Sequence, residues 1–408
     1  MKKLYLITKT FPLGTEEKAF LQYEVELLEN NFDLTIVVTE QGKKSGCEND
    51  IKYNVVKAYT NPKIWEKIIS AIRFLLKREA WEEFAQIIKG KKLIVKRLFR
   101  ALMFGTAAET FWKKLKMTCN IHKGIDAVFY FYWWDYKCLG VTMYQKKYPN
   151  MRVVTRTHGY DLYDERELYG KQFFKKQMER NLKKIFFISE YGKRYYEEHS
   201  GKKDDSKYEL CRLGVKEQSL QHKVISTEFL MVSCSNVIPL KRVELIVEGL
   251  SQITDTKIKW IHFGDGEELE KTEALAGKLL DRKENISYRF AGRVDNQTVM
   301  NFYRDNSIGC FITTTSTEGN PVSVQEALSF GIPVIGTTVS DIPLMIKGNG
   351  VLLSADPKPK EVAEAIMIIA DASEAERKSM SERSHQIWKN DYDAEKNYNH
   401  FIEVLLKV

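Results

Sequence analysis

The sequence predicts an α/β protein with two doubly wound domains, each a parallel sheet covered by helices on both faces. Short apolar, β-branched runs alternate with amphipathic helical segments along most of the 408 residues. The alternation gives way to a polar, irregular segment at 216–226 and then starts again. A chain of this length also exceeds what one hydrophobic core usually organises, so two domains are expected.

The first half of the chain alternates strands and helices as far as Gly214. Its first strand runs into the loop Phe11-Pro12-Leu13-Gly14-Thr15, which contains a single glycine, so the dinucleotide-binding fingerprint is absent. The loop is either a plain strand-to-helix turn or a place where Gly14 and Thr15 approach a ligand. Strands are expected at Leu4–Thr8, Leu34–Thr39, Asp126–Trp133, Arg152–Thr157, Ile185–Ser189 and Tyr208–Leu213, and helices at Glu16–Asn30 and Lys137–Tyr148.

The segment 61–123 differs from its surroundings. It has helical periodicity, repeated aromatic residues, and fifteen lysines and arginines against five glutamates, a local net charge of +10 in a chain whose total is +8. Basic, aromatic helices are typical of contact with an anionic membrane surface or a lipid-linked acceptor. A helical insertion with a solvated basic face fits equally well. Nucleic acid is a weaker alternative, because no recognition motif accompanies the charge.

A second α/β alternation starts at Phe229. We therefore expect domains at 1–215 and 222–385, with the C-terminal helix, about 386–408, packing back on the first domain. Two such domains facing each other form a cleft suited to two substrates. Strands are expected at Phe229–Ser233, Lys257–Phe263, Ile286–Phe290, Ile308–Thr315, Ile332–Thr338 and Val351–Leu353, and helices at Leu240–Leu250, Glu267–Leu280, Gln297–Arg304, Glu361–Ala370 and within Glu374–Val408.

The stretch 308–338 contains the densest functional signal. A buried strand leads to Asn320 and Pro321, a helix start with proline expected at the first helical position. Glu318 falls in the loop before this helix and Glu326 inside it, while Gly331 is expected to end it. The exposed amides of the helix start attract phosphate, and carboxylates bind hydroxyl groups. An anion seat flanked by two acids therefore suits a sugar nucleotide.

Three other short motifs stand out, two of which follow predicted strands. His158-Gly159 lies where open sheets bind ligands, although a lone histidine is more often structural. Gly264-Asp265-Gly266 is either a strand-to-helix turn or a phosphate or nucleoside contact. Asp391-Tyr392-Asp393 has the spacing of a metal-binding pair but sits in the helical tail, so it is interpreted as capping of a helix start.

The composition excludes several classes of protein. Hydrophobic residues make up 43% and charged residues 29%, an ordinary globular balance, and the pI of about 8.9 indicates mild attraction to anions. The N-terminal segment has no signal-peptide pattern, and no apolar run is long enough to span a membrane. The six cysteines and seven histidines are scattered, which favours free thiols in a reducing cytoplasm and gives no zinc site.

Together these motifs resemble the retaining family-4 glycosyltransferases, which have the GT-B fold of two Rossmann-like domains across a cleft. The resemblance is carried by Glu318 and Glu326 within EGNPVSVQEALSFGIPVIGTT, which look like the family's signature acid pair. His158-Gly159, Gly264-Asp265-Gly266 and the end of the strand at Phe290–Val294 stand in the expected order around it. Leu213-Gly214-Val215 looks like the family's domain junction.

The resemblance implies a role for each matching residue. Glu326 would bind the ribose hydroxyls, Glu318 the hydroxyls of the donor sugar, and Lys241 the diphosphate. The family's usual arginine is replaced by Asn236, and Arg242 is expected to supply part of the missing charge. The remaining implied contacts are the amides around Gly319, Asn320 and Pro321 for sugar and diphosphate, Gly264 and Gly266 for the donor, Arg293 and Val294 for the base, His158 for a distal sugar hydroxyl, and Gly14 and Thr15 for phosphate or acceptor.

The implied activity is retaining transfer from a nucleotide sugar, expected to be a UDP-sugar, to a glycan or lipid-linked acceptor in surface polysaccharide biosynthesis. The departing phosphate would take the acceptor's proton, and no metal or cofactor is expected because Lys241, Arg242 and the helix start supply positive potential. We expect a cytoplasmic protein with peripheral contact at the inner face of the plasma membrane through 61–123, and no nucleic-acid partner.

Other functions on the same fold stay open. A sugar-nucleotide epimerase would lack the acceptor-side membrane surface, and a phosphorylase would need a pyridoxal phosphate lysine, for which no motif is present. A non-catalytic glycosyltransferase-like subunit that binds a partner is a third option. The presence of Glu318, Glu326, Lys241 and His158 argues against that option.

Overall fold

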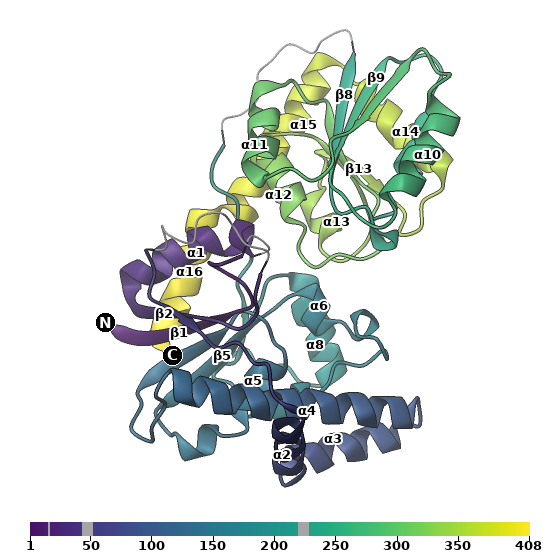
Figure 1. The fold of residues 1–408 in the computed structure, drawn as a ribbon. Coiled ribbons are helices and arrows are strands. Elements are labelled where there is room, and N and C mark those ends of the chain that lie inside the picture. Colours follow the sequence, from purple (N-terminus) through teal and green to yellow (C-terminus); the bar gives the residue numbers. More distant parts are fainter. Residues whose placement is uncertain (15–16, 43–51, 219–227) are drawn as a thin grey trace. The chain divides into compact units, whose positions relative to one another are not determined.

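The computed structural model describes residues 1–14, 17–42, 52–218 and 228–408 (Figure 1). The chain divides into two compact units, the first made of Met1–Cys211 with Tyr398–Val408 and the second of Arg212–Asn397. Each unit is built on one parallel sheet with helices on both faces, so the predicted fold class is confirmed. Thr15 and residues 219–226 of the predicted linker lie outside the described residues.

The first unit contains a seven-stranded sheet in the order β3-β2-β1-β4-β5-β6-β7, with every neighbouring pair parallel. The order runs outward in both directions from β1 and β4, so the topological switch point lies between these two strands. The strands are β1 Lys2–Thr8, β2 Phe32–Val38, β3 Val55–Lys57, β4 Ala127–Phe131, β5 Met151–Thr157, β6 Lys184–Phe187 and β7 Tyr208–Leu210. The short edge strand β3 was not predicted.

Helices cover both faces of the first sheet. On one face, α1 and α16 pack side by side, with Leu21, Val25, Phe401 and Leu405 buried against the strands. On the other face lie α4, α5 and α8. The helices of this unit outside the basic insertion are α1 Lys18–Asn31, α5 Tyr136–Thr142, α6 Gly159–Leu162, α7 Lys175–Glu179, α8 Glu190–Ser200 and α16 Ala394–Lys407, with 3₁₀ turns η2 Gln145–Lys147 and η3 Asp164–Arg166.

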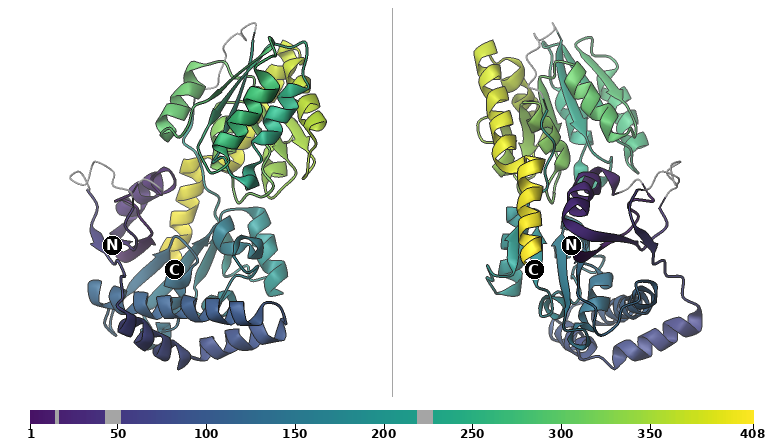
Figure 2. Two further views of the ribbon diagram at one scale, coloured as in Figure 1. Left: turned by 45° about the vertical axis from the view of Figure 1, so that its right-hand side comes forward. Right: turned by 90° about the vertical axis from the view of Figure 1, so that its left-hand side faces the viewer.

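The basic insertion forms three helices, α2 Ile64–Leu75, α3 Arg78–Lys89 and α4 Ile94–Thr118, which confirms its predicted helical character. The long α4 packs on α5, and α2 and α3 form an outer layer on α4 (Figure 2). Close approach depends on small residues: a Cβ on Gly105 would lie 2.2 Å from the ring of Phe74, and one on Gly140 would lie 2.5 Å from the carbonyl oxygen of Ala108.

The second unit contains a six-stranded parallel sheet in the order β10-β9-β8-β11-β12-β13. In chain order this is 3-2-1-4-5-6, the dinucleotide-binding arrangement, with the switch point between β8 and β11. The strands are β8 Phe229–Cys234, β9 Ile258–Phe263, β10 Ile286–Phe290, β11 Cys310–Thr313, β12 Val334–Thr337 and β13 Gly350–Leu353. All six predicted strands of this half are therefore confirmed.

Two helical layers cover the second sheet, α9, α10 and α14 on one face and α11, α12, α13 and η5 on the other. Gly331 (φ 71°) ends α12 with a Schellman motif, in which the amides of Gly331 and Ile332 donate to the carbonyls of Leu328 and Ala327. The elements are η4 Pro239–Lys241, α9 Glu244–Ser251, α10 Leu269–Leu280, α11 Asn296–Asp305, α12 Val322–Ser329, α13 Ile342–Met345, α14 Pro359–Ala370, α15 Glu374–Ile387 and the π-helical η5 Trp388–Tyr392.

Three predicted boundaries were wrong. The helix predicted at Leu240–Leu250 is the short turn η4 followed by α9, because Arg242 adopts a left-handed conformation (φ 49°) that ends the turn. Pro321 is not the first residue of α12 but precedes it in extended conformation. The predicted C-terminal helix, about 386–408, is interrupted by η5 before α16 begins at Ala394.

The chain passes between the units at two places that lie against each other. Val215 pairs with Asp393 in an isolated bridge, and a Cβ on Gly214 would lie 2.5 Å from the Cα of Ala394. The indole of Trp388 donates to the carbonyl of Val215 at 3.0 Å. The carboxylate of Asp393 accepts the amide of Glu395 at 2.8 Å, so the predicted capping role is confirmed for this residue.

A buried ion pair in the first unit gives a stability prediction. Arg156 and Glu24 form this pair with fully buried side chains, and the hydroxyl of Tyr130 donates to Glu24 at 2.8 Å. Glu24→Ala leaves the guanidinium buried and uncompensated, so we expect the free energy of unfolding to fall by about 3–5 kcal/mol. Urea unfolding followed by circular dichroism measures this loss.

The matched control is the double variant Glu24→Leu with Arg156→Met, which removes both charges. We expect it to recover most of the lost stability, because apolar residues of similar volume need no partner. A double variant that is as unstable as Glu24→Ala would show that the unpaired charge of Arg156 contributes little to the loss of unfolding free energy.

Candidate active site

The predicted donor residues come from two loops that leave the second sheet at its switch point. The strands β8 and β11 are neighbours, and the loops that follow them carry Lys241 and Glu318. Carboxyl ends of adjacent parallel strands open onto the same edge, where open α/β sheets bind ligands. The predicted position of Glu318 at the mouth of the sheet is therefore the one seen in the structure, and Lys241 lies beside it.

The side chains of Lys241 and Glu318 form an ion pair across these loops. Both side chains are about four-fifths buried. The backbone amide of Glu318 donates to the hydroxyl of Ser340 at 3.3 Å, and Ser340 itself has a positive φ of 50°. A non-glycine residue in that conformation costs free energy, and such residues are concentrated at functional sites.

The start of α12 has backbone amides available for an anion. The amides of Val324 and Gln325 donate back to the carbonyl of Pro321. Those of Val322 and Ser323 have no acceptor within the helix, because the first turn of a helix has no preceding carbonyls. The side chain of Asn320 is buried and accepts a hydrogen bond from the side-chain amide of Gln325, which fixes the chain just before the helix. This geometry agrees with an anion seat.

Glu326 projects from the second turn of α12 and is buried. Its carboxylate accepts one hydrogen bond, from the side chain of Asn296 at the start of α11, at 2.6 Å. Burial raises the pKa of Glu326 to about 7, and the hydrogen bond from Asn296 opposes this rise only in part. A buried carboxylate with so few hydrogen bonds to offset its burial is typical of a functional site, where hydroxyl groups of a ligand can donate to it.

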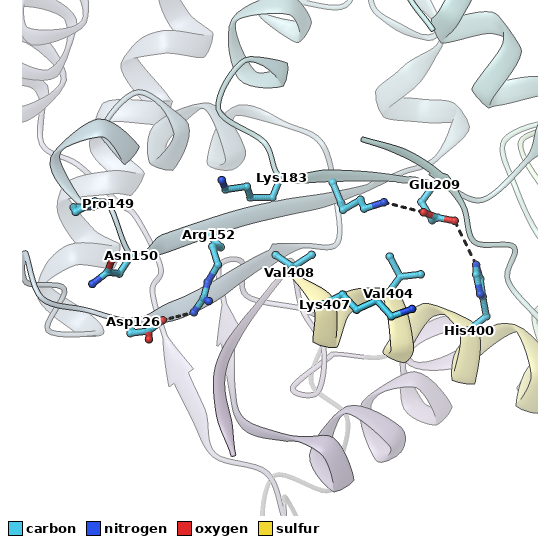
Figure 3. Close-up of a pocket in the computed structure, with 11 residues that line it drawn as sticks. Asp126, Pro149, Asn150, Arg152, Lys183, Glu209, His400, Val404, Lys407 and Val408 are labelled. Atoms are coloured by element: carbon cyan, nitrogen blue, oxygen red, sulfur yellow. Dashed lines mark hydrogen bonds and ion pairs between the residues drawn. The ribbon is translucent and has the colours of Figure 1, made fainter. Parts of the chain in front are cut away.

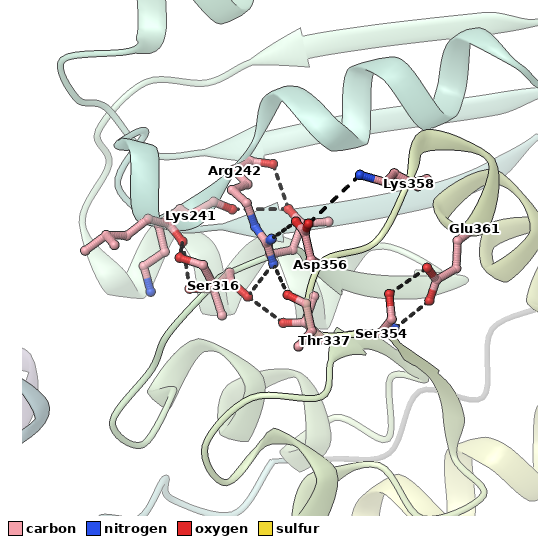
Figure 4. A network of polar contacts seen from close by, with 12 residues as sticks. Lys241, Arg242, Ser316, Thr337, Ser354, Asp356, Lys358 and Glu361 are labelled. Atoms are coloured by element: carbon pink, nitrogen blue, oxygen red, sulfur yellow. Dashed lines mark hydrogen bonds and ion pairs between the residues drawn. The ribbon is translucent and has the colours of Figure 1, made fainter. Parts of the chain in front are cut away.

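Arg242 makes contacts within the protein that the sequence did not predict. Its guanidinium donates to the carbonyls of Thr314, Thr315 and Ala355 at 2.7–3.0 Å and pairs with Asp356 at 3.0 Å (Figure 4). These contacts tie together the loops after β8, β11 and β13. The guanidinium is therefore engaged by the protein, and the predicted contacts of Arg242 and Lys241 with a diphosphate stay predictions. Asn236, five residues before Lys241, is exposed in the loop after β8.

Gly264 and Gly266 let two loops approach each other closely. A Cβ on Gly264 (φ 148°) would lie 1.8 Å from the carbonyl oxygen of Ser235, and one on Gly266 would lie 2.3 Å from that of Val237. The amide of Val237 also donates to the carbonyl of Asp265 at 3.0 Å. The close approach of the two loops in this strand-to-helix turn is therefore enough to explain both glycines. Their predicted contact with the donor stays a prediction.

The predicted base-binding pair follows β10 in the turn before α11. Arg293 is exposed, while Val294 is half-buried against the core beneath α11. The same turn leads directly to Asn296, which donates to Glu326. The structure therefore connects the end of β10 to the buried carboxylate through one short segment.

In the first unit, His158 ends β5 and caps α6. Its ring packs against the rings of Tyr132 and Trp133, with centroids 4.7 and 4.4 Å away. Only 11% of the side chain is exposed, yet neither ring nitrogen has a hydrogen-bond partner among the described residues. Nδ1 lies 3.9 Å from the carboxylate of Asp161, which is beyond hydrogen-bond distance. The predicted contact of His158 with a sugar hydroxyl stays a prediction.

Aromatic residues beside His158 were not predicted as site residues. Trp133 follows β4 at the switch point of the first sheet and packs edge-on against Tyr160, whose ring is half exposed. The ammonium of Lys9, after β1, lies 4.7 Å from the ring centre of Trp133 and 4.4 Å from that of Tyr160. The run Tyr132-Trp133-Trp134 at a strand end was the available signal.

The buried Glu17 holds this edge in place. Its carboxylate accepts the amides of Thr10 and Phe11 at 2.7 and 3.0 Å, and also the indole of Trp133. Gly14 lies in the same loop, and its amide donates to the carbonyl of Thr10 at 2.8 Å. Thr15, the other predicted acceptor-side residue, lies outside the described residues.

A separate cavity of about 760 Å³ opens at the opposite, amino edge of the first sheet, between the starts of β5 and β6 and the end of α16 (Figure 3). Its charges are largely paired with one another: Glu209 contacts Lys184 at 3.0 Å and His400 at 3.5 Å. Over the described ranges, no cluster of three or more His, Cys, Asp or Glu residues could hold a metal ion. None of the helices described there has the length and apolarity needed to cross a bilayer.

Comparison with known proteins agrees with this geometry. Residues 215–386, nearly the whole second unit, match the family model described as glycosyl transferases group 1. The second unit is therefore similar to that glycosyltransferase family, which agrees with the resemblance to glycosyltransferases seen in the sequence. No curated protein matches the chain.

Solved structures match the chain over both units. The apo lipopolysaccharide outer core galactosyltransferase WaaB is 16% identical, with full coverage of both chains and a TM-score of 0.67. Anabaena HepE in complex with UDP and glucose is 12% identical, also with full coverage, at 0.69. Sucrose-phosphate synthase from Thermosynechococcus elongatus is 13% identical, covering 100% of this chain and 99% of its own, at 0.69. At these identities the likeness establishes the GT-B fold.

The raised pKa of Glu326 gives a pH prediction. Between about pH 4.5 and pH 7 the folded state binds a proton at Glu326 that the unfolded state has released, so this group lowers stability as the pH rises. Relative to Glu326→Gln, we expect the wild type to lose on the order of 3 kcal/mol of unfolding free energy between pH 5 and pH 8. Urea titrations at several pH values measure the difference.

The control is Glu273→Gln at an exposed position of α10, whose stability should follow the wild type at every pH. Parallel curves for the wild type and Glu326→Gln would show that Glu326 titrates at an ordinary pKa.

Proposed function

We propose that the protein is a retaining glycosyltransferase that moves a sugar from a UDP-sugar to a glycan or lipid-linked acceptor. The observation that carries this proposal is the group at the switch point of the second sheet: the Lys241–Glu318 pair, the start of α12 and the buried Glu326. HepE, with the same fold, has structures with UDP and with UDP-glucose, which supports the choice of a uridine donor.

Each part of this group suits one part of a nucleotide sugar. The amides of Val322 and Ser323 and the ammonium of Lys241 would hold the diphosphate. Ionised Glu326 would accept hydrogen bonds from two ribose hydroxyls, which replace the water that burial removes. Glu318, paired with Lys241, would orient the hydroxyls of the donor sugar next to the diphosphate. The turn at Arg293 and Val294 would border the base.

Transfer with retention needs no enzymatic nucleophile in this proposal. The bond between the anomeric carbon and the diphosphate oxygen breaks, and the acceptor oxygen bonds to the same face of the sugar. The acceptor's proton passes to the departing phosphate oxygen. The protein's part is to position both substrates and to stabilise the negative charge that develops on the diphosphate. Lys241 and the start of α12 supply that stabilisation without a metal ion.

The first unit would contribute recognition of a sugar ring. The aromatic faces of Trp133 and Tyr160 suit the apolar C–H face of a glycan. The ring nitrogens of His158 make no hydrogen bond to the described residues, so they suit its hydroxyl groups. We place the protein in the cytoplasm, acting in surface polysaccharide biosynthesis with peripheral association at the inner face of the membrane. WaaB, described as a lipopolysaccharide galactosyltransferase, supports this setting.

Donor binding tests the proposal directly. Thermal shift and nucleotide release with UDP-, GDP- and ADP-sugars identify the donor, and calorimetry then compares its nucleoside diphosphate with the bare nucleoside. Lys241→Met should weaken diphosphate binding about ten- to hundredfold, because a charged hydrogen bond contributes about 1.5–3 kcal/mol. Nucleoside binding should not change. Glu326→Ala should weaken the binding of both the nucleoside diphosphate and the nucleoside.

Lys271→Met removes another ion-paired lysine of the same unit and should bind both ligands like the wild type. The product should keep the donor's anomeric configuration by NMR, and activity should survive EDTA. Failure of every nucleotide to bind would contradict the proposal, as would inversion, or epimerisation of the donor without transfer.

Acceptor recognition gives a second prediction. Trp133→Ala removes the ring that packs against both His158 and Tyr160. We expect the KM for the acceptor to rise about tenfold, since such ring contacts contribute about 0.5–1.5 kcal/mol beyond their buried area. The Kd for the nucleotide should stay unchanged. Steady-state kinetics with varied acceptor measure the first quantity and calorimetry the second.

Trp133→Phe keeps an aromatic face, so its acceptor KM should fall between those of the wild type and Trp133→Ala. This intermediate value separates the contribution of the ring from a general loss of folding. An acceptor KM that is unchanged in Trp133→Ala would remove this edge of the first sheet from the acceptor site.

A further inference from the structure

The helix α2 presents its apolar side to solvent. Ser70 and Phe74, one turn apart, are its buried residues, and both face α4. The hydroxyl of Thr110 donates to that of Ser70 at 3.1 Å, and the ring of Phe74 lies over Gly105. The side of α2 that contacts the protein is therefore narrow and fixed.

The opposite side of α2 consists of large apolar residues. Ile64, Ile68 and Ile72 recur every four residues, so they form one stripe along the helix. Their exposed fractions are 77%, 56% and 55%. We call the following exposed set the α2 face: Ile64, Trp65, Ile68, Ile69, Ile72 and Leu76. An amphipathic surface helix normally turns such a stripe toward the protein core. The outward α2 face is therefore a surface on which a binding partner can pack.

The α2 face continues onto α3. The indole of Trp81 donates to the carbonyl of Leu75 at 2.8 Å, which fixes Trp81 beside the end of α2. The ring of Trp81 is 61% exposed, and Ile88 is exposed further along α3. Contiguous apolar surface of this extent on a soluble protein marks an interaction site.

Positive charge surrounds this surface. Lys67 and Arg73 are exposed on α2, at the sides of the stripe. At the turn from α3 to α4, exposed lysines alternate with exposed apolar residues, the lysines being Lys89, Lys91, Lys92 and Lys96 and the apolar residues Leu93, Val95 and Phe99. The three helices lie in a segment with fifteen basic residues against five acidic ones. The complementary surface is therefore apolar and anionic.

A bilayer of anionic phospholipid has both properties. A second copy of this chain would bring the same positive charge against itself. With 12 residues, α2 is about 18 Å long, shorter than the roughly 30 Å of a hydrocarbon core, so it can lie in the bilayer surface but cannot cross it. Tryptophan beside isoleucine and lysine is the composition of helices that lie at the headgroup boundary.

We propose that α2 lies in the plane of an anionic phospholipid bilayer, with the α2 face and Trp81 among the upper acyl chains and the lysines of the α3–α4 turn on the headgroups. This inference specifies the membrane partner of the proposed glycosyltransferase. Binding to lipid does not require a nucleotide, so its failure is distinct from failure of the donor site.

Vesicle sedimentation of the full chain tests the proposal. Vesicles of phosphatidylcholine with about 30% phosphatidylglycerol should bind the wild type, and pure phosphatidylcholine should bind it at least about tenfold more weakly. Ile68→Glu with Ile72→Glu should reduce binding to the anionic vesicles at least about tenfold, because the stripe can no longer enter the acyl region. Lys91→Glu with Lys92→Glu should reduce it too.

Ile368→Glu is the matched control, since Ile368 of α14 has the same 56% exposure as Ile68 and lies in the second unit. It should bind vesicles like the wild type. Tryptophan emission should shift to the blue on vesicle binding, and Trp65→Phe should diminish that shift. All of these substitutions lie on the surface, so every variant should still bind nucleotide. Nucleotide binding therefore serves as the check that each variant is folded.

Three outcomes would overturn the proposal. Binding that ignores anionic lipid would exclude the headgroup contact, and binding that survives Ile68→Glu with Ile72→Glu would exclude insertion of α2. A lipid-free dimer by light scattering that dissociates in the same variant would show that a second copy covers the α2 face.

Discussion

The donor edge of the second sheet depends on one guanidinium. Arg242 holds the carbonyls of Thr314, Thr315 and Ala355, so loops from separate strands converge on a single side chain. Its left-handed backbone ends η4 and sets Lys241 at the tip of the turn. This clamp lies next to both Lys241, the last residue of η4, and the loop after β11 that carries Glu318. The guanidinium that the sequence associates with a ligand thus also connects three loops at the mouth of the sheet.

Both units place their notable residues by the same topological rule. Each sheet runs outward from a switch point, β1 with β4 in the first unit and β8 with β11 in the second. At each one, a lysine on the first loop meets an acidic or aromatic group on the next, Lys9 with Trp133 and Lys241 with Glu318. A parallel sheet thus brings residues separated by more than seventy positions together without any local signal between them.

This explains how far the sequence could predict the structure. Buried strands such as Ile286–Phe290 were predictable because their periodicity is local, and Gly331 because only a left-handed residue completes the helix end. The acid pair Glu318 and Glu326 was predictable from its place between a strand and a helix. In contrast, the clamp formed by Arg242 and the packing of Trp133 against His158 depend on loops whose conformations are set by tertiary contacts. Nor could periodicity alone show that the apolar stripe of α2 faces outward, since it fixes the stripe but not its direction.

The position of α16 has a consequence for the order in which the molecule is completed. Phe401, Ile402, Val404 and Leu405 belong to the same hydrophobic core as β1, β4 and α1, whereas the second unit ends at Asn397. On the ribosome, where residues emerge in sequence, the second unit can close its core first. The first unit, although its strands are made earliest, must wait for residues 398–408 before one face of its sheet is covered. Until then its apolar strands remain available to chaperones, so the unit that begins the chain is the last to be finished.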